Sequence, residues 1–123
     1  MNAVNWFEIP VQDFDRAVNF YEALLQISME RMLFDNVPNA LFPYKDGVGG
    51  AIAQVPYANA GDEGLLVYLN VSSMEVLDKA LAQVENLGGE VLMPKKDIGN
   101  PGHIAVIRDT EGNRVGLNVR PGA

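Results

Sequence analysis

The sequence predicts an α+β fold made of two tandem βαβββ modules. Strand and helix patterns follow one another along the 123 residues in the order β-α-β-β-β, and the same order then recurs. The two halves repeat at a spacing of about sixty residues, which is the mark of an internal duplication. Hydrophobic residues make up 48% of the chain and charged residues 20%, as in an ordinary soluble globular protein. We expect each helix to cover the outer face of a small sheet, with the other sheet faces lining a shared cleft.

The first half begins with a strand at 4–11, which is rich in β-branched and aromatic residues. Asp13 is placed to cap the following helix. In that helix the apolar residues recur every three or four positions and form one face: Phe14, Ala17, Val18, Phe20, Tyr21, Leu24 and Leu25. Turn residues then separate three further expected strands, at 27–34, 40–44 and 50–55, with turns at 36–39 and 45–47.

The stretch from Pro56 to Gly64 breaks this pattern and is the best candidate for a linker. The predicted organisation is one domain over 1–123, with modules at 1–56 and 65–123 and a linker at 57–64. In the second half, Ser73 is placed to cap a helix that Gly88 and Gly89 close. The strands around that helix are expected at 65–71, from 90 to 93, at 103–108 and at 114–119, with a loop at 97–102 and a turn at 109–113.

Composition excludes several classes of function. The net charge is −7, so phosphate backbones and anionic lipid surfaces are poor partners, and we expect no binding to nucleic acid or membranes. The chain has no cysteine, which removes disulfides, thiolate metal sites and cysteine nucleophiles. His103 is the only histidine, so one chain cannot build a histidine-rich metal site. With neither a signal-like N-terminus nor a long apolar run, a cytoplasmic protein is expected.

Two segments carry a family resemblance. Residues 13–21, Asp-Phe-Asp-Arg-Ala-Val-Asn-Phe-Tyr, resemble the Asp-x-x-x-Ala-x-x-Phe-Tyr signature of the vicinal oxygen chelate superfamily. Residues 109–117, Asp-Thr-Glu-Gly-Asn-Arg-Val-Gly-Leu, resemble its closing Asp-Pro-x-Gly-Asn-x-x-x-Leu. The superfamily includes glyoxalase I, extradiol dioxygenases, and fosfomycin and bleomycin resistance proteins. The first strand, with Trp-Phe-Glu-Ile, is most similar to that of small proteins related to lactoylglutathione lyase. The resemblance implies a cupped eight-stranded mixed sheet with helices outside, and a homodimer.

The resemblance also implies four metal-ligand positions, one on the first and one on the last strand of each module. Carried over singly, these positions hold Trp6, Ala51, Leu66 and Gly116, and none of those side chains can coordinate an ion. If the positions were misplaced by one residue along their strands, the candidates would be Asn5, Phe7, Ile52 and Val67. These residues do not form a metal site either. Glu8 is the one good ligand nearby, and a single carboxylate does not hold a divalent ion. We therefore expect no metal and no other cofactor.

If Trp6 faces the cleft, alternation along the strand brings Glu8 to the same face. The matching faces of the second module carry Leu66, Tyr68, Gly116 and Asn118. These residues and Ala51 form the predicted ligand-binding set, with Glu8 the candidate catalytic base, and the small residues Ala51 and Gly116 leave room for a ligand.

Each of these residues also has a structural interpretation. Trp6 can fill the core, Glu8 can pair with an arginine, and Tyr68 can be a packed strand residue. His103 is expected to face solvent, since the sequence offers it no obvious carboxylate partner.

Three hypotheses follow. The protein is a metal-independent lyase or isomerase of small-molecule metabolism, with Glu8 as base and Tyr68 or His103 assisting. Alternatively, it sequesters a drug or metabolite without catalysis, as bleomycin-resistance members of the family do. A dimeric scaffold with a vestigial cleft is the third. A metal-dependent activity of the glyoxalase I type is disfavoured, because none of the side chains at the four metal-ligand positions can coordinate an ion.

Overall fold

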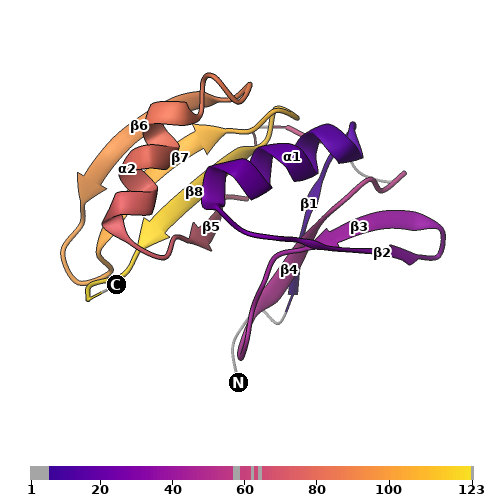
Figure 1. The fold of residues 1–123 in the computed structure, drawn as a ribbon, viewed down its shortest axis with the longest axis horizontal. Helices are drawn as coiled ribbons and strands as arrows, with labels where there is room; N and C mark the ends of the chain where they lie inside the picture. The colour runs from indigo at the N-terminus through magenta and orange to yellow at the C-terminus, as the bar shows by residue number, and fades with distance from the viewer. Residues whose placement is uncertain (1–5, 57–58, 62, 64, 123) are drawn as a thin grey trace. The chain divides into compact units, whose positions relative to one another are not determined.

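The structure is a computed structural model of the 123-residue chain, and it describes residues 6–56, 59–61, 63 and 65–122. The chain divides into two compact units, Met1–Ala60 and Gly61–Ala123 (Figure 1). Each unit contains a strand, a helix and three more strands in that order. The predicted α+β fold of tandem βαβββ modules is therefore confirmed. Parts of the predicted linker, residues 57–58, 62 and 64, lie outside the described residues.

The first unit is a four-stranded mixed sheet with one helix. Its sheet has the strand order β1-β4-β3-β2, in which β1 and β4 are parallel and the other pairs are antiparallel. The elements are β1 (Trp6–Pro10), α1 (Phe14–Leu25), β2 (Glu30–Phe34), β3 (Val37–Leu41) and β4 (Gly49–Ala53).

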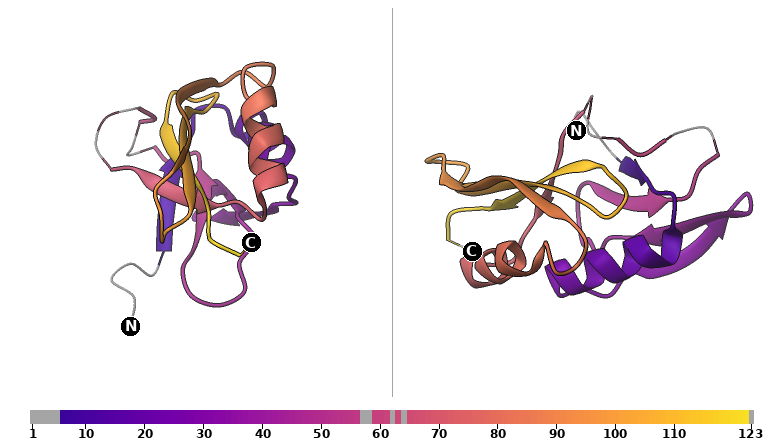
Figure 2. Two further views of the ribbon diagram at one scale, coloured as in Figure 1. Left: turned by 90° about the vertical axis from the view of Figure 1, so that its left-hand side faces the viewer. Right: turned by 90° about the horizontal axis from the view of Figure 1, so that it is seen from above.

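The second unit repeats this topology. Its sheet has the order β5-β8-β7-β6, again with one parallel pair, β5 and β8. The elements are β5 (Val67–Asn70), α2 (Met74–Gln83), β6 (Glu90–Asp97), β7 (His103–Arg108) and β8 (Arg114–Val119). Each helix lies along one face of its own sheet, with α1 contacting β4 and α2 contacting β8 (Figure 2).

Both predicted helix caps are confirmed. The Asp13 carboxylate accepts a hydrogen bond from the backbone N–H of Arg16 at 3.1 Å, and the Ser73 hydroxyl accepts one from Val76 at 3.2 Å. The predicted end of the second helix is wrong. The helix stops at Gln83, and Gly89 closes a separate turn by donating to the Val84 carbonyl at 2.9 Å.

The first hairpin is shifted by three residues from its prediction. The turn consists of Asp35 and Asn36, whose φ angles are 49° and 65°, and β3 begins at Val37 rather than at residue 40. Two residues with positive φ form the tight hairpin turn that matches strand twist, and Asp and Asn tolerate that region. Pro38 fits inside the strand because pairing between β3 and β4 begins only at Asn39, so its missing N–H leaves no gap there.

The strand β6 is longer than predicted. It continues to Asp97, with register shifts on both sides of Met93, and it includes Lys95 and Lys96, which lie beyond the predicted segment from 90 to 93. Lys95 is held on the strand by Asp78 of α2, with 2.8 Å between Nζ and Oδ1. Strands β7 and β8 have the predicted bounds, and β5 is shorter than the predicted 65–71. No helix among the described residues is both long and apolar enough to span a membrane.

Candidate functional site

One face of the first sheet packs against α1. The ring of Phe7 lies 5.8 Å from that of Phe42, which in turn lies 5.4 Å from the ring of Tyr21 in the helix. Ile9 is buried and is in register with Ile52 of β4. Because side chains alternate along a strand, Trp6 and Glu8 must lie on the opposite face, which the helix does not cover.

An aromatic pair stands on this helix-free face. Trp6 is half-buried, and its ring meets that of Tyr44 edge to face, with 5.8 Å between centroids and an interplanar angle of 78°. The Tyr44 ring lies over Gly49, the register partner of Trp6, so that a Cβ on Gly49 would come within 2.5 Å of it. Sequence reasoning missed Tyr44, because nothing in its own segment shows that it folds over a neighbouring strand.

Glu8 is exposed on the same face, and its register partner on β4 is Ala51. Across the sheet, Ala51 is in register with Leu41 of β3, and Leu41 is in register with Glu30 of β2. Three strand spacings, about 14 Å, separate Glu8 from Glu30, so these two carboxylates cannot hold one ion together. Ala51 itself is fully buried, although it was predicted to line the ligand site.

The second sheet is arranged in the same way. Leu69, Leu117 and Ala105 are in register and buried, on the side of α2. Tyr68 and Gly116 are register partners on the opposite, helix-free face. The prediction that Gly116 leaves room for a ligand is wrong, since the Tyr68 ring covers it: a Cβ at this position would lie only 2.8 Å from Tyr68 Cγ.

Asn118 has a structural role in this sheet. Its side-chain amide donates to the backbone carbonyls of Pro101 and His103, at 3.0 Å each, and so fastens the loop before β7 to β8. Leu66 is half-buried and immediately precedes β5. Tyr68 is exposed, so it is the predicted residue of this unit that offers the most surface to a ligand.

His103 does not assist Tyr68. In the uninterrupted pairing of β7 with β8, it is in register with Val119, on the helix side of the sheet, whereas Tyr68 lies on the other side. The expectation that His103 lacks a carboxylate partner is also wrong. Asp97 is its register partner on β6, with 3.8 Å between Nε2 and Oδ2.

Residues of both motifs that carry the family resemblance stabilise the fold. In the first motif, Asp13 caps α1 and Ala17 and Tyr21 are fully buried. In the second, the buried Asp109 carboxylate accepts from the N–H groups of Glu111 and Asn113, at 2.8 Å each, and from the Asn113 side chain at 3.1 Å. The Asn113 side-chain oxygen accepts from the N–H of Gly61 at 3.0 Å, which anchors the start of the second unit.

Comparison with known proteins agrees with these motifs. The sequence model of the Glyoxalase/Bleomycin resistance protein/Dioxygenase superfamily matches residues 3–117. The chain belongs to this superfamily. No curated protein sequence matches it significantly.

Solved structures of the glyoxalase superfamily show the same fold at low sequence identity. A glyoxylase/bleomycin resistance protein/dioxygenase domain from Frankia sp. EAN1pec has a TM-score of 0.71 at 18% identity, with 98% of each chain covered. A glyoxalase/bleomycin resistance protein from Albidiferax ferrireducens T118 has a TM-score of 0.70 at 19% identity, covering 97% of this chain and all (100%) of the other. Glyoxalase I from Zea mays has a TM-score of 0.65 at 16% identity, covering 93% of this chain but 44% of the maize chain.

The side chains of this glyoxalase-superfamily member do not fit a divalent metal at the positions that the family implies. Two of these positions, Ala51 and Gly116, are in register with Glu8 and Tyr68, so one carboxylate faces an alanine and a phenol covers a glycine. Within the described ranges, no group of three or more His, Cys, Asp or Glu side chains comes together in a way that could hold a metal ion.

Proposed function

We propose that this glyoxalase-superfamily protein binds a small organic molecule with a flat, cationic group, and that it does so without a divalent metal. One observation carries the proposal: the Trp6–Tyr44 pair and the Glu8 carboxylate share the face of the first sheet that α1 leaves uncovered. Aromatic faces attract cations and flat rings, and a nearby carboxylate adds a matching charge. The net charge of −7 favours a cationic ligand over an anionic one.

The proposed mode of action is sequestration. Exposed Tyr44 supplies an edge or face to a ring, half-buried Trp6 holds Tyr44 in place, and Glu8 supplies the charge. None of these roles includes a chemical reaction, so sequestration does not require a second group that exchanges a proton with Glu8. The proposal includes a cytoplasmic location, which is compatible with a chain that contains no cysteine.

A metal-independent lyase or isomerase is the second candidate. It is supported by the exposure of Glu8 next to an aromatic pair, where a carboxylate can reach a bound molecule and remove a proton from it. Within the second unit, His103 and Tyr68 cannot act together on one bound molecule, because their side chains lie on opposite faces of the sheet. Turnover of any bound compound that stops in Glu8→Gln would favour this candidate over sequestration.

Trp6 provides the first test because it is the only tryptophan of the chain. We would titrate the protein with aromatic quaternary ammonium compounds and follow tryptophan fluorescence and the melting temperature. A ligand that binds only the folded state raises that temperature. Tyr44→Ala is expected to weaken binding about tenfold, the effect of roughly 1.4 kcal/mol. Phe34→Ala is the matched control, since Phe34 and Tyr44 are both 53% exposed.

The outcome separates the hypotheses. Equal losses of affinity in the two variants, or no binding by any cationic aromatic compound, would refute the proposed site. The metal-free part of the proposal has its own test, in which Ni, Co, Zn, Mn and Mg are added in turn to metal-stripped protein. We expect no rise in melting temperature. A stoichiometric ion with a clear rise would instead favour activity of the glyoxalase I type.

A further inference from the structure

Two exposed aspartates of the first unit stand apart from its polar contacts. Among the described residues, no hydrogen bond or ion pair involves the carboxylate of Asp35 or that of Asp46. The carboxylate of every other described aspartate accepts from the backbone or pairs with a cation: Asp13, Asp15, Asp78, Asp97 and Asp109. The carboxyl groups of Asp35 and Asp46 are therefore the ones available for reaction with their own backbone.

The residue that follows distinguishes these two aspartates. Asp46 precedes Gly47, which is the one Asp-Gly pair of the chain, and the chain has no Asn-Gly pair. Asp35 precedes Asn36. Both following residues have a left-handed backbone, with φ of 88° at Gly47 and 65° at Asn36. Gly47 has no Cβ, however, so the carboxyl group of Asp46 can approach the Gly47 nitrogen without a steric obstacle.

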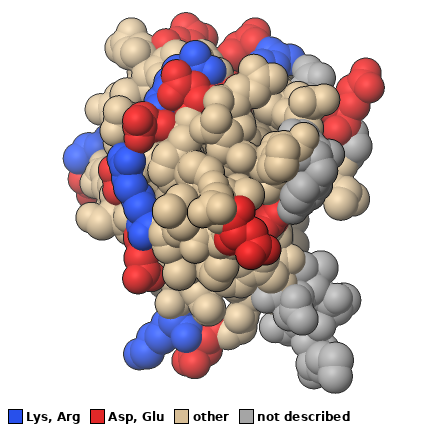
Figure 3. Space-filling model, turned by 90° about the vertical axis from the view of Figure 1, so that its right-hand side faces the viewer, with Lys and Arg blue, Asp and Glu red and all other residues tan. Residues whose placement is uncertain are grey.

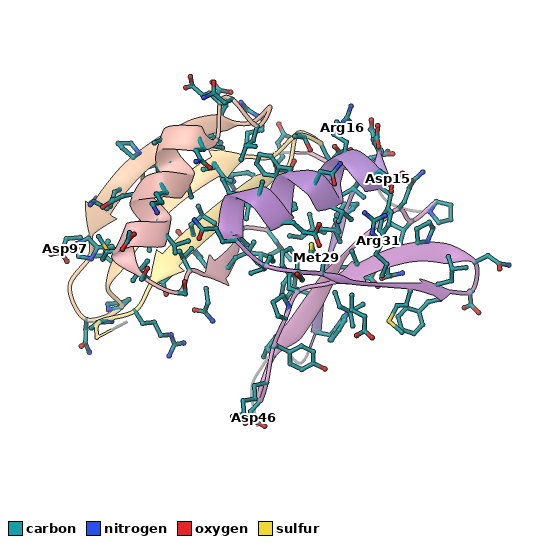
Figure 4. All side chains as sticks on the ribbon, viewed as in Figure 1. Asp15, Arg16, Met29, Arg31, Asp46 and Asp97 are labelled. Atoms are coloured by element: carbon teal, nitrogen blue, oxygen red, sulfur yellow. The ribbon has the colours of Figure 1, made fainter. Side chains whose placement is uncertain are left out.

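The Asp46–Gly47 pair lies in the exposed loop between β3 and β4. Residues 43–48 are all exposed, whereas Phe42 and Gly49 on either side of them are buried. Figure 4 shows Asp46 at the tip of this loop. In Figure 3 the same end of the first unit is at the bottom of the view, with basic and acidic atoms on its surface. The N–H of Gly47 donates no hydrogen bond to another described residue, so nothing there holds its nitrogen away from the carboxyl group.

We propose that Asp46 is a site of isoaspartate formation. The backbone nitrogen of Gly47 attacks Cγ of Asp46 and loses its proton, one water molecule leaves, and a five-membered succinimide ring closes. Water then adds to one of the two ring carbonyls, whose bond to the nitrogen breaks. Opening at the side-chain carbonyl restores aspartate. Opening at the main-chain carbonyl leaves the chain connected through the former side chain, which is isoaspartate. The net change is an isomerisation, and it needs no oxidant or reductant.

The isomerisation affects Tyr44, because the loop that carries both residues is closed at its base. The N–H of Phe42 donates to the carbonyl of Gly50 at 3.0 Å. Within the loop, the Tyr44 ring lies over Gly49 and against the ring of Trp6. Isoaspartate adds one carbon atom to the main chain between Tyr44 and Gly49. We therefore expect the contact between Tyr44 and Trp6 to loosen in the altered form.

Asp35 serves as the internal control for an ageing experiment on the native chain. During incubation at neutral pH and physiological temperature, isoaspartate should form at Asp46 at least about tenfold faster than at Asp35, a difference of about 1.4 kcal/mol in the barrier. Gly47→Asn gives Asp46 the same neighbour that Asp35 has, and asparagine tolerates the left-handed backbone. This variant should therefore age at Asp46 no faster than at Asp35. Asp46→Glu should not react, because its ring would need six members and closes far more slowly.

Three measurements follow the reaction and its consequence. Peptide mapping with a protease that cleaves before aspartate, but not before isoaspartate, gives the extent of conversion at each position. In water enriched in heavy oxygen, each passage through the succinimide leaves one heavy oxygen atom at residue 46. Fluorescence reports on Tyr44, because Trp6 is the only tryptophan of the chain. The emission should change as the native chain ages and stay constant in Asp46→Glu, while circular dichroism checks that both remain folded.

The proposal is overturned if isoaspartate forms no faster at Asp46 than at Asp35, if Gly47→Asn ages like the native chain, or if no heavy oxygen enters residue 46. Constant Trp6 emission in the converted chain would overturn the consequence for Tyr44. Only a loss of ligand affinity on ageing rests on the proposed function, since the isoaspartate measurements use no ligand. A chain that ages at Asp46 but binds no cationic aromatic compound would keep this inference and refute the proposed function.

Discussion

Replacing Asp109 by alanine should destabilise the protein severely, although this residue touches no proposed ligand. Asp109 is 3% exposed, and its carboxylate accepts hydrogen bonds from the N–H groups of Glu111 and Asn113 and from the Asn113 side chain. Asp109→Ala leaves three buried donors without that acceptor, at a cost of about 1–3 kcal/mol each. Allowing for partial relaxation, we expect a loss of about 3–6 kcal/mol, much of the stability of an ordinary domain.

Asp97 provides a matched control for this measurement. Its Oδ1 accepts a hydrogen bond from the N–H of Gly99, two residues further along the chain, at 2.9 Å. Asp109 makes the equivalent hydrogen bond with the N–H of Glu111. The side chain of Asp97 is 70% exposed, however, so water replaces the lost acceptor. Asp97→Ala should therefore cost less than about 1 kcal/mol.

Urea and thermal unfolding, followed by circular dichroism, give both numbers. For a chain of this length, 1 kcal/mol corresponds to a shift of about 4 °C in Tm, so Asp109→Ala should melt at least about 12 °C below the native protein. Asp109→Asn keeps one acceptor oxygen and should lie between the two. Equal losses for Asp97→Ala and Asp109→Ala would show that burial does not set the cost, and the reasoning would fail.

Three further changes test the packing, each by urea unfolding. Gly102→Ala should cost about 2–4 kcal/mol, because Gly102 has a φ of 101° and its Cβ would overlap the Val119 carbonyl; a neutral result would contradict the close approach of these two segments. Asp13→Ala should cost about 1 kcal/mol through the lost cap of α1, with Asp13→Asn close to neutral. Leu24→Ala, at a position 1% exposed, should cost about 3–5 kcal/mol, and a loss below about 1 kcal/mol would show that the helix does not pack as described.

Local sequence patterns predicted most of the fold, because most elements are specified by their own residues. The caps at Asp13 and Ser73, the apolar spacing of α1, and the bounds of β7 and β8 were all predictable. The predictions failed where pairing with another strand decides the outcome. Pro38 reads as a turn residue, yet it lies in β3 because pairing with β4 begins only one residue later. Lys95 lies beyond the segment predicted from 90 to 93, yet it belongs to β6, because β6 pairs with β7 as far as Asp97 and Asp78 of α2 binds the Lys95 amine.

The same limit applies to the candidate site. Alternation correctly separates Phe7 from Trp6 and Glu8, since it depends only on strand geometry. No pattern within β8 shows that the Tyr68 ring fills the space above Gly116, or that Tyr44 folds over Gly49. Both facts depend on which residue of a distant segment comes into register.

By itself, the sequence determined the order of the elements, the duplicated plan and the residue types at the family's ligand positions, because each of these follows from local chemistry. Tertiary structure alone decided which side chains share a face. It placed Asp97 beside His103, placed His103 on the face of its sheet opposite Tyr68, and left β2 at the edge of the first sheet. The physical reason is that a strand has two faces and two edges, and only its neighbours determine which of them is covered.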